Sequence, residues 1–478
     1  MLINYRKIGY ICFIIAIACF ICGCDEDHNK LTNLRVSEIG ADGITFIWDN
    51  SLDFCAYTKR GYGNQIDNME YYLFKNDKKV FTRYSGACDE NPPNKHYEYN
   101  TIGEGIYYVM DSYSRAFDSS GFVHEEASSN KIKVSLPEKI SAELNPVSVA
   151  VNSRTNKAYV VNSGSNTVTV INGADKSTQS VPVGLSPSAA AVNEVTNKVY
   201  VANTQGNTVT VIDGGNNMTE EIVVGANPCA IAINETTNMI YVANMGGNTV
   251  SAIDGVDHKV FTVNVGSAPC ALAVKEKPSR IYVVNSLGNS VTVIDGTTLA
   301  TKEMPVGSAP CAIAVDQIWD KIYIANSGSD SVTVINGVDN TTRAIAVGNN
   351  PVGIAFNERG STAYVLNRGS LSVTAIDWNT QTRTLGLVPD STITVSDPCA
   401  IAVNPGNGDV YVTNRGSHNV TVIEEHAPKK NVYIVKSTGK SPRAIGVNTA
   451  TGNVYTANYE SADVMISYPV VRVDNTSK

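Results

Sequence analysis

The sequence predicts an all-β chain in which a small β-sandwich precedes a β-propeller, with eight blades favoured and seven as the alternative. Repetition predicts the propeller, because a tyrosine returns every 41 residues through six copies of a Tyr-Val-x-Asn motif, followed by two copies at gaps of 47 and 44. Self-similarity at a period of about 20–50 residues indicates a solenoid, a propeller or an array. The non-repeating stretch before it alternates short β patterns with turns, which predicts the sandwich. The eight motif tyrosines are Tyr159, Tyr200, Tyr241, Tyr282, Tyr323, Tyr364, Tyr411 and Tyr455.

Each repeat reads as four short strands joined by tight turns. In the third copy an apolar run follows Pro228 and Cys229, a second run contains Tyr241, and Asp254-Gly255 marks a hairpin before the fourth run. Four strands in roughly 40–45 residues make one propeller blade. No stretch of the repeats keeps a 3.6-residue apolar period, so helices are not expected there. The propeller is therefore assigned to residues 138–473.

A closed ring must cover the open edge of its last blade. Residues 138–146 align with fourth strands such as residues 222–228, so we expect this segment to complete the blade that begins at Ser441. Residues 468–473 are the rival for the same position.

The repeated tetrapeptides, such as YVVN, YVAN and YVTN, resemble the YVTN family of β-propeller repeats found in surface-layer-like and secreted proteins. Many members of that family have seven blades, whereas the count here favours eight. The resemblance implies the fold without implying one activity, because propellers host binding scaffolds, lactonases, lyases and haem enzymes.

The first 23 residues read as a lipoprotein signal peptide. Arg6 and Lys7 precede a 14-residue apolar run, and residues 21–24 (ICGC) resemble a bacterial lipobox with Cys24 as the lipidated residue. An ordinary signal peptide and an uncleaved anchor are the alternatives. Residues 24–34 would then be the anchor linker, and the protein is expected in the cell envelope, membrane-anchored and facing the periplasm or the cell exterior.

The β-sandwich is assigned to residues 35–136. Trp48 at the end of an early strand, the Tyr107-Tyr108-Val109 run and the Asp-x-x-Gly-like turn before Gly121 resemble a fibronectin type III domain. Cys55 and Cys88 are the only cysteines in this stretch. In an oxidising compartment they are a candidate disulfide, and two unpaired thiols are the alternative.

Charge and motifs exclude several function classes. A formal net charge of −8 argues against a nucleic-acid partner, which would need a basic surface. No haem-attachment, nucleophile-elbow or zinc-protease motif occurs, so no cofactor and no catalytic residue are assigned. Four cysteines recur after the proline of the first strand, and they are either a thiolate cluster for a soft metal or small buried residues between blades. Strand alternation places Cys229 on the same face as Ile231 and Ile233, which favours the buried role, so no metal is assigned. The four cysteines are Cys229, Cys270, Cys311 and Cys399.

Residues that break the repeat are the best candidates for a site. The recurrent motif Asn is expected to be structural, bonding to the backbone two residues on. Arg368, Arg415 and His418 follow the second strand in late repeats and are the candidate ligand-face residues, although loop residues also vary freely. The predicted role is adhesion, envelope organisation or binding of a protein or glycan partner on a propeller face. A lactonase-like or lyase-like enzyme at the channel mouth is the alternative, and a haem or redox partner lacks evident axial ligands.

Overall fold

The computed structural model describes residues 35–40, 43–48, 66–75, 78–85, 95–99, 105–117, 121–128, 131–377, 379–386, 396–424, 431–436 and 439–473. All regular elements in these ranges are β-strands, and none contains a helix able to cross a membrane. The chain forms two compact units, one of residues 37–42 with 136–469 and one of residues 1–36, 43–135 and 470–478. Cys24, Cys55 and Cys88 lie outside the described residues.

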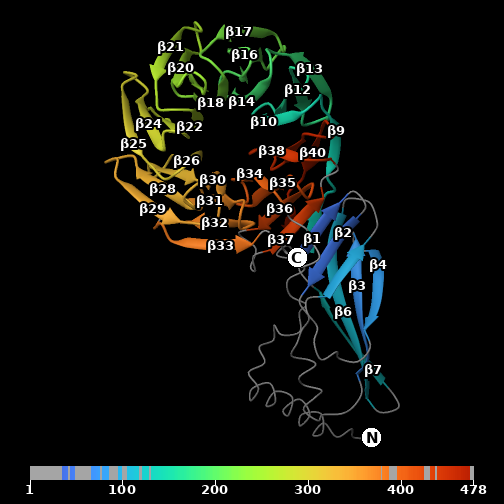
Figure 1. The fold of residues 1–478 in the computed structure, drawn as a ribbon. Coiled ribbons are helices and arrows are strands. Elements are labelled where there is room, and N and C mark those ends of the chain that lie inside the picture. Colours follow the sequence, from blue (N-terminus) through green and yellow to red (C-terminus); the bar gives the residue numbers. More distant parts are fainter. Residues whose placement is uncertain are drawn as a thin grey trace, which may run out of the picture. The chain divides into compact units, whose positions relative to one another are not determined.

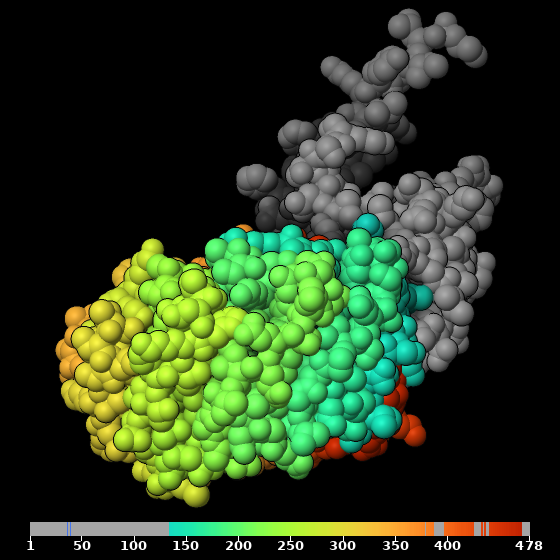
Figure 2. Space-filling view, turned by 90° about the horizontal axis from the view of Figure 1, so that it is seen from above, coloured from blue at the N-terminus to red at the C-terminus, as the bar shows by residue number. Residues whose placement is uncertain are grey.

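The larger unit is an eight-bladed propeller, which confirms the count of eight (Figure 1). Each blade is an antiparallel sheet of four strands, and consecutive blades lie side by side around the ring (Figures 1 and 2). The first, innermost strands are β10 (Pro146–Asn152), β14 (Pro187–Asn193), β18 (Pro228–Asn234), β22 (Pro269–Lys275), β26 (Pro310–Asp316), β30 (Pro351–Asn357), β34 (Pro398–Val403) and β38 (Pro442–Val447). The second strands are β11 (Lys157–Asn162), β15 (Lys198–Asn203), β19 (Met239–Asn244), β23 (Arg280–Asn285), β27 (Lys321–Asn326), β31 (Thr362–Asn367), β35 (Val410–Asn414) and β39 (Val454–Asn458).

The outer half of each blade is built from the third and fourth strands. The third strands are β12 (Thr167–Asn172), β16 (Thr208–Asp213), β20 (Thr249–Asp254), β24 (Ser290–Asp295), β28 (Ser331–Asn336), β32 (Ser372–Ile376), β36 (Asn419–Glu424) and β40 (Asp463–Ser467). The fourth strands are β13 (Thr178–Pro182), β17 (Thr219–Val223), β21 (Val260–Asn264), β25 (Thr301–Pro305), β29 (Thr342–Ala346), β33 (Thr382–Gly386), β37 (Asn431–Lys436) and, for the last blade, β9 (Glu138–Ser141). We call the face with the second-to-third-strand loops the upper face, and the opposite face the lower face.

The second strands form the continuous core, because both of their faces are covered by neighbouring blades. In β15, for example, Val199, Tyr200 and Val201 are all fully buried. The hydroxyl of Tyr200 is buried and has no hydrogen-bond partner among the described residues. The tyrosine repeat therefore marks a large side chain packed between blades.

Small residues on each first strand make room for branched side chains of the next blade. A Cβ added at Gly446 in β38 would lie 2.9 Å from Cγ1 of Val149, and one added at Gly353 in β30 would lie 3.1 Å from Cγ2 of Ile401. Most other blades have alanine at these positions. The Ala-x-Ala pattern is thus explained by close packing near the propeller axis.

The motif Asn is structural, but its hydrogen bonds differ from the expected turn. In blade four the side-chain Nδ2 of Asn285 donates to Ser290 Oγ at 3.0 Å and to Thr292 Oγ1 at 2.9 Å, both on the third strand. Thr292 Oγ1 in turn accepts the backbone N–H of Gly266 at 3.2 Å. Asn285 is fully buried, so its amide needs hydrogen-bond partners inside the protein. The two hydroxyls supply them, and the amide thereby links the second strand to the third.

Replacing Asn285 with alanine should lower the free energy of unfolding by about 2 kcal/mol, because two buried hydroxyls lose their donor. Urea denaturation measures this, with Asn264→Ala on the exposed side of β21 as the control expected to change it by less than about 0.5 kcal/mol. Equal stability of the two variants would contradict a structural role for the buried amide.

The hairpins between third and fourth strands lie where the Asp-Gly pairs predicted them, but the residue with positive φ after β20 is His258, at 59°, and not Asp254 or Gly255. Asp213 Oδ1 accepts the N–H of Gly215 at 2.8 Å, and Asp254 Oδ1 accepts that of Val256 at 2.8 Å. A side-chain oxygen bonded two residues on is the Asx-turn arrangement.

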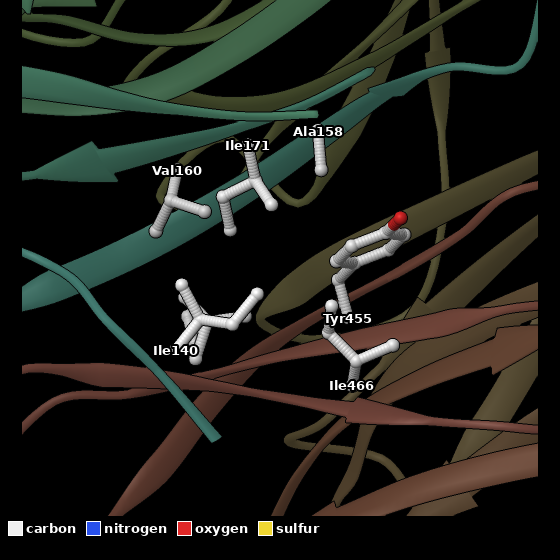
Figure 3. Packing of buried hydrophobic residues seen from close by; sticks show 8 residues of the cluster. Ile140, Ala158, Val160, Ile171, Tyr455 and Ile466 are labelled. Atoms are coloured by element: carbon white, nitrogen blue, oxygen red, sulfur yellow. The ribbon is translucent and has the colours of Figure 1, made fainter. Parts of the chain in front are cut away.

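Residues 138–146 close the ring, as the sequence predicted. Strand β9 pairs antiparallel with β40, with Ile140 opposite Val464, so an early segment completes the last blade. Ile140 lies in one apolar cluster with Val160 and Ile171 of blade one and with Tyr455 and Ile466 of blade eight (Figure 3). The rival segment contributes β41 (Val471–Val473), which pairs with β8 in the smaller unit.

A further strand extends blade seven. Strand β1 (Arg35–Gly40) runs parallel to β37, with Glu38 opposite Ile434 and Ile39 opposite Val435. It covers the outer edge that β37 would otherwise leave open.

The smaller unit is also built from strands. Strands β4, β3, β6, β8 and β41 pair in that order, β7 pairs with β6, and β2 pairs with β5. Their bounds are β2 (Gly43–Trp48), β3 (Ile66–Lys75), β4 (Lys78–Ser85), β5 (Lys95–Tyr99), β6 (Gly105–Phe117), β7 (Gly121–Ser128) and β8 (Lys131–Val134).

Candidate ligand-binding site

The repeat is broken on the upper face, at the residue after each motif Asn. Four blades carry a serine or threonine there, blade three carries a methionine, and the last three blades carry two arginines and a tyrosine. The eight residues in order are Ser163, Thr204, Met245, Ser286, Ser327, Arg368, Arg415 and Tyr459. The hydroxyls donate to backbone carbonyls, as from Ser286 Oγ to Ala268 O at 3.0 Å and from Ser327 Oγ to Ala309 O at 2.8 Å. An arginine is too long for that contact and has to find another acceptor.

Asp397 is the acceptor that both arginines use. Arg368 Nε lies 2.5 Å from Asp397 Oδ1 and Arg415 Nε lies 2.5 Å from Asp397 Oδ2, and each Nη2 also contacts the same carboxylate. The two predicted residues are thus brought together across blades six and seven. The three side chains are 29–38% exposed, so the ion pairs add little to stability and leave the charges accessible.

Sequence reasoning missed Asp397 itself. It precedes the proline of β34 in the left-handed region, with φ of 52°. The equivalent residues are Asn145, Ser186, Asn227, Ala268, Ala309, Asn350 and Ser441, so an acid at this position occurs in blade seven alone. The sequence did contain a signal, because this one acidic residue occurs close to two repeats that each carry an unusual arginine.

The charge on Asp397 is held by its partners. Burial raises the pKa of its carboxyl, but the hydrogen bonds and positive charges of Arg368 and Arg415 outweigh burial and bring the pKa below its usual value. Asp397 is therefore a fixed anion near neutral pH that orients two guanidinium groups.

Blade eight adds a third arginine. Arg443 occupies the position of the recurrent cysteines, and its guanidinium lies 3.5 Å from the ring centroid of Tyr459, a cation–π contact. Its Nε is buried and has no hydrogen-bond partner among the described residues. Cys399 connects the blades, because its Sγ lies 3.2 Å from Pro442 O and 3.8 Å from Arg443 O. We call Arg368, Asp397, Arg415 and Arg443 the arginine arc.

His418 belongs to the loop architecture. Its Nδ1 accepts the N–H of Ser441 at 3.0 Å, the contact that Asn248 Oδ1 makes with the N–H of Ala268 at 2.9 Å in another blade. The ring is exposed, and no contact with Arg368 or Arg415 is found among the described residues. The structure therefore places His418 on the same face as the arginines, in the role that asparagine has elsewhere.

The recurrent cysteines link neighbouring blades. Cys229 Sγ lies 3.3 Å from Pro269 O and Cys311 Sγ lies 3.3 Å from Pro351 O, so each thiol reaches the proline carbonyl of the next blade. Burial raises the pKa of Cys229 to about 11, which keeps it a thiol donor. No group of three or more His, Cys, Asp or Glu side chains within the described ranges is arranged to hold a metal ion.

One detail of the cysteine prediction was wrong. Alternation placed Cys229 on the same strand face as Ile231 and Ile233, but Ile231 and Ile233 pack toward Tyr200 of the preceding blade, whereas Cys229 contacts the following one. The cause is a β-bulge between Pro228 and Ala230, which resets the alternation.

The fold and its repeats define an eight-bladed β-propeller repeat protein. Residues 133–451 match the model of the YNCE-like beta-propeller family, and the chain belongs to that family.

Solved structures that match this chain are distant in sequence. Hydrazine synthase of Kuenenia stuttgartiensis is 18% identical, with 69% of this chain and 96% of that chain covered and a TM-score of 0.49. A streptogramin B lyase is 12% identical, with 70% and 97% covered and a TM-score of 0.49. Sqt1 of Saccharomyces cerevisiae is 9% identical, with 69% and 98% covered and a TM-score of 0.57. No curated protein sequence matches the chain. Of these three structures, Sqt1 has a TM-score above 0.5, and at 9% identity it shows the fold alone.

Proposed function

We propose that the chain is a lipid-anchored binding protein of the cell envelope, whose upper propeller face binds a protein or glycan partner. The observation that carries the proposal is the arginine arc, because an otherwise regular ring is broken in three adjoining blades at one face. Local departures from a consistent pattern are expected at functional sites.

The rest of the chain supports attachment and presentation. The lipobox-like ICGC sequence would place lipid on Cys24, with residues 24–34 as the linker to the membrane. Residues 35–136 would form the fibronectin type III-like sandwich, with Cys55 and Cys88 as its disulfide in an oxidising compartment. A nucleic-acid partner is not proposed, because the chain is acidic overall.

Convergence of charged groups from three blades is also what a lactonase-like or lyase-like enzyme would need. The arc supplies only a weak base, however, because Arg368 and Arg415 bring the pKa of the Asp397 carboxyl below its usual value. Asp397 is held as an anion by two guanidinium groups, and burial keeps the Cys399 thiol protonated by raising its pKa. The arrangement offers fixed positive charge, which favours binding over general-base catalysis.

Crosslinking in intact native cells tests the proposal. A photoreactive residue at Leu287, 80% exposed on the upper face, should give a specific crosslinked partner, whereas one at Val256, 82% exposed on the lower face, should not. The Leu287 crosslink should disappear in an Arg368→Gln, Arg415→Gln double variant. Equal crosslinking from both faces, or an unchanged crosslink in the double variant, would contradict upper-face recognition.

The anchor is tested in the same cells. The protein should fractionate with membranes and Cys24→Ser should release it into the soluble fraction. Membrane association that survives Cys24→Ser would exclude lipid at this residue as the tether.

A further inference from the structure

We infer that the arginine arc binds the carboxylate of an acidic sugar, so that the partner on the upper face is an acidic glycan. This inference rests on the proposed function and names the chemistry of its ligand. It starts from the charge of the arc, which has three guanidinium groups against one carboxylate. Lys440 and Glu460 in the adjoining loops, joined by a backbone hydrogen bond of 3.2 Å, add no net charge.

The arc is a local feature of an acidic chain. The formal net charge of the whole protein is −8, so a long polyanion would be repelled outside the arc. A ligand with a single anionic group fits both the positive charge of the arc and the negative charge of the rest of the chain. Arginine is also the side chain whose planar donors fit a carboxylate in two places at once.

The geometry leaves donors for such a ligand. Arg368 and Arg415 use Nε and Nη2 for Asp397, which holds their planes in place and keeps Nη1 outside the pair. Arg443 is held against Tyr459, and its buried Nε has no partner among the described residues. A buried donor without an acceptor is unfavourable, and the half-buried Arg443 adds the positive charge of its guanidinium to the arc.

Four of the other five blades have the opposite hydrogen-bonding character at this position, and the fifth carries Met245. The hydroxyls of Ser163, Ser286 and Ser327 each donate their hydrogen to a backbone carbonyl, at 3.0, 3.0 and 2.8 Å. Thr204 does the same with Pro228 O at 2.8 Å. Toward a ligand these oxygens are acceptors, and they suit a molecule that brings its own hydroxyl donors. A ligand that has one carboxylate for the arginines and several hydroxyls of its own is a sugar with a uronic acid unit.

Calorimetric titration of the full-length protein tests the inference. The probe is an oligosaccharide that contains a single uronic acid unit, compared with its methyl ester of the same length and with a peptide that carries the same charge through one glutamate. We expect the oligosaccharide to bind and the ester to bind at least about tenfold more weakly, because esterification removes the charge that the guanidinium groups recognise.

Variants locate the site. Arg443→Gln and Arg368→Gln should each weaken the oligosaccharide at least about tenfold, whereas Arg154→Gln, at a 60% exposed arginine on the lower face, should leave it unchanged. Thermal unfolding of each variant confirms that the propeller is intact, and Arg443→Lys is the second variant where Arg443→Gln unfolds, again with weaker binding expected because lysine lacks the planar fork.

Other results would overturn the inference. Equal binding of acid and ester, tighter binding of the peptide, or binding indifferent to Arg443 and Arg368 would each exclude an acidic sugar in the arc. Such a result together with a Leu287 crosslink would leave the proposed function standing with a different partner, whereas loss of the crosslink would remove both.

Discussion

Between pH 10 and pH 12 the free energy of unfolding of the propeller should fall steeply, because its motif tyrosines remain protonated only while they are buried. Burial raises the pKa of Tyr159 to about 12 and that of Tyr200 to about 12, from an ordinary value of 10.0. Burial raises the pKa of five other core tyrosines in the same direction, namely Tyr241, Tyr282, Tyr323, Tyr411 and Tyr455.

The sign follows from proton binding. Above pH 10 a tyrosine in the unfolded chain loses its proton while the buried one in the folded chain keeps it, so the unfolded state binds fewer protons and stability falls as pH rises. Tyr159 and Tyr200 each contribute about 1.4 kcal/mol per pH unit within this window, and the other five act in the same direction. These two tyrosines alone would remove about 3 kcal/mol per pH unit, which is a large fraction of the stability of an ordinary domain.

Urea denaturation at a series of pH values, followed alongside phenolate absorbance, measures the effect. Phenolate from the core tyrosines should form together with unfolding, after the exposed tyrosines have titrated. A fully titrated tyrosine complement in a still folded propeller would contradict the prediction.

Tyr200→Phe is the matched control. It removes one titrating group and should make the pH dependence between pH 10 and pH 12 shallower. Near neutral pH it should change stability by less than about 1 kcal/mol, because the Tyr200 hydroxyl has no hydrogen-bond partner among the described residues.

The propeller was predictable because the patterns that define its strands and turns lie within each repeat of the sequence. The spacing of Tyr200 and Tyr241 sets the blade, the Asp-Gly pairs set the hairpins, and residues 138–146 resemble a fourth strand closely enough to identify the closing segment. All three are local patterns, read within one repeat or by aligning one repeat with another.

The site was only partly predictable because it depends on contacts between repeats. Arg368 and Arg415 could be singled out as departures, but Asp397 is 29 residues from the first and 18 from the second, and only the ring brings all three together. The side of the strand on which Cys229 lies could not be predicted from the sequence for another reason. One β-bulge reverses the alternation of side chains along a strand, and no distinctive residue marks the bulge.

Ile140→Asp should destabilise the propeller by at least about 4 kcal/mol, because it loses a buried apolar side chain and places a charge in the cluster that joins the last blade to the first. Ile140 is 8% exposed and packs with Val160 and Tyr455. The chain passes directly from β9 of blade eight to β10 of blade one, so the pairing of β9 with β40 is what attaches the other three strands of blade eight to the start of the ring.

Denaturation and hydrogen exchange distinguish a closure defect from general damage. Ile345→Asp places the same change at the same strand position of blade five, so it should cost similar stability while speeding exchange in β28, whereas Ile140→Asp should speed exchange in β40. Ser141→Asp adds an equal charge one residue along at an exposed position and should have little effect. Unchanged protection of β40 in Ile140→Asp would mean that the ring is closed by contacts elsewhere, such as Asn448 Nδ2 with Asn156 Oδ1 at 2.9 Å on the lower face.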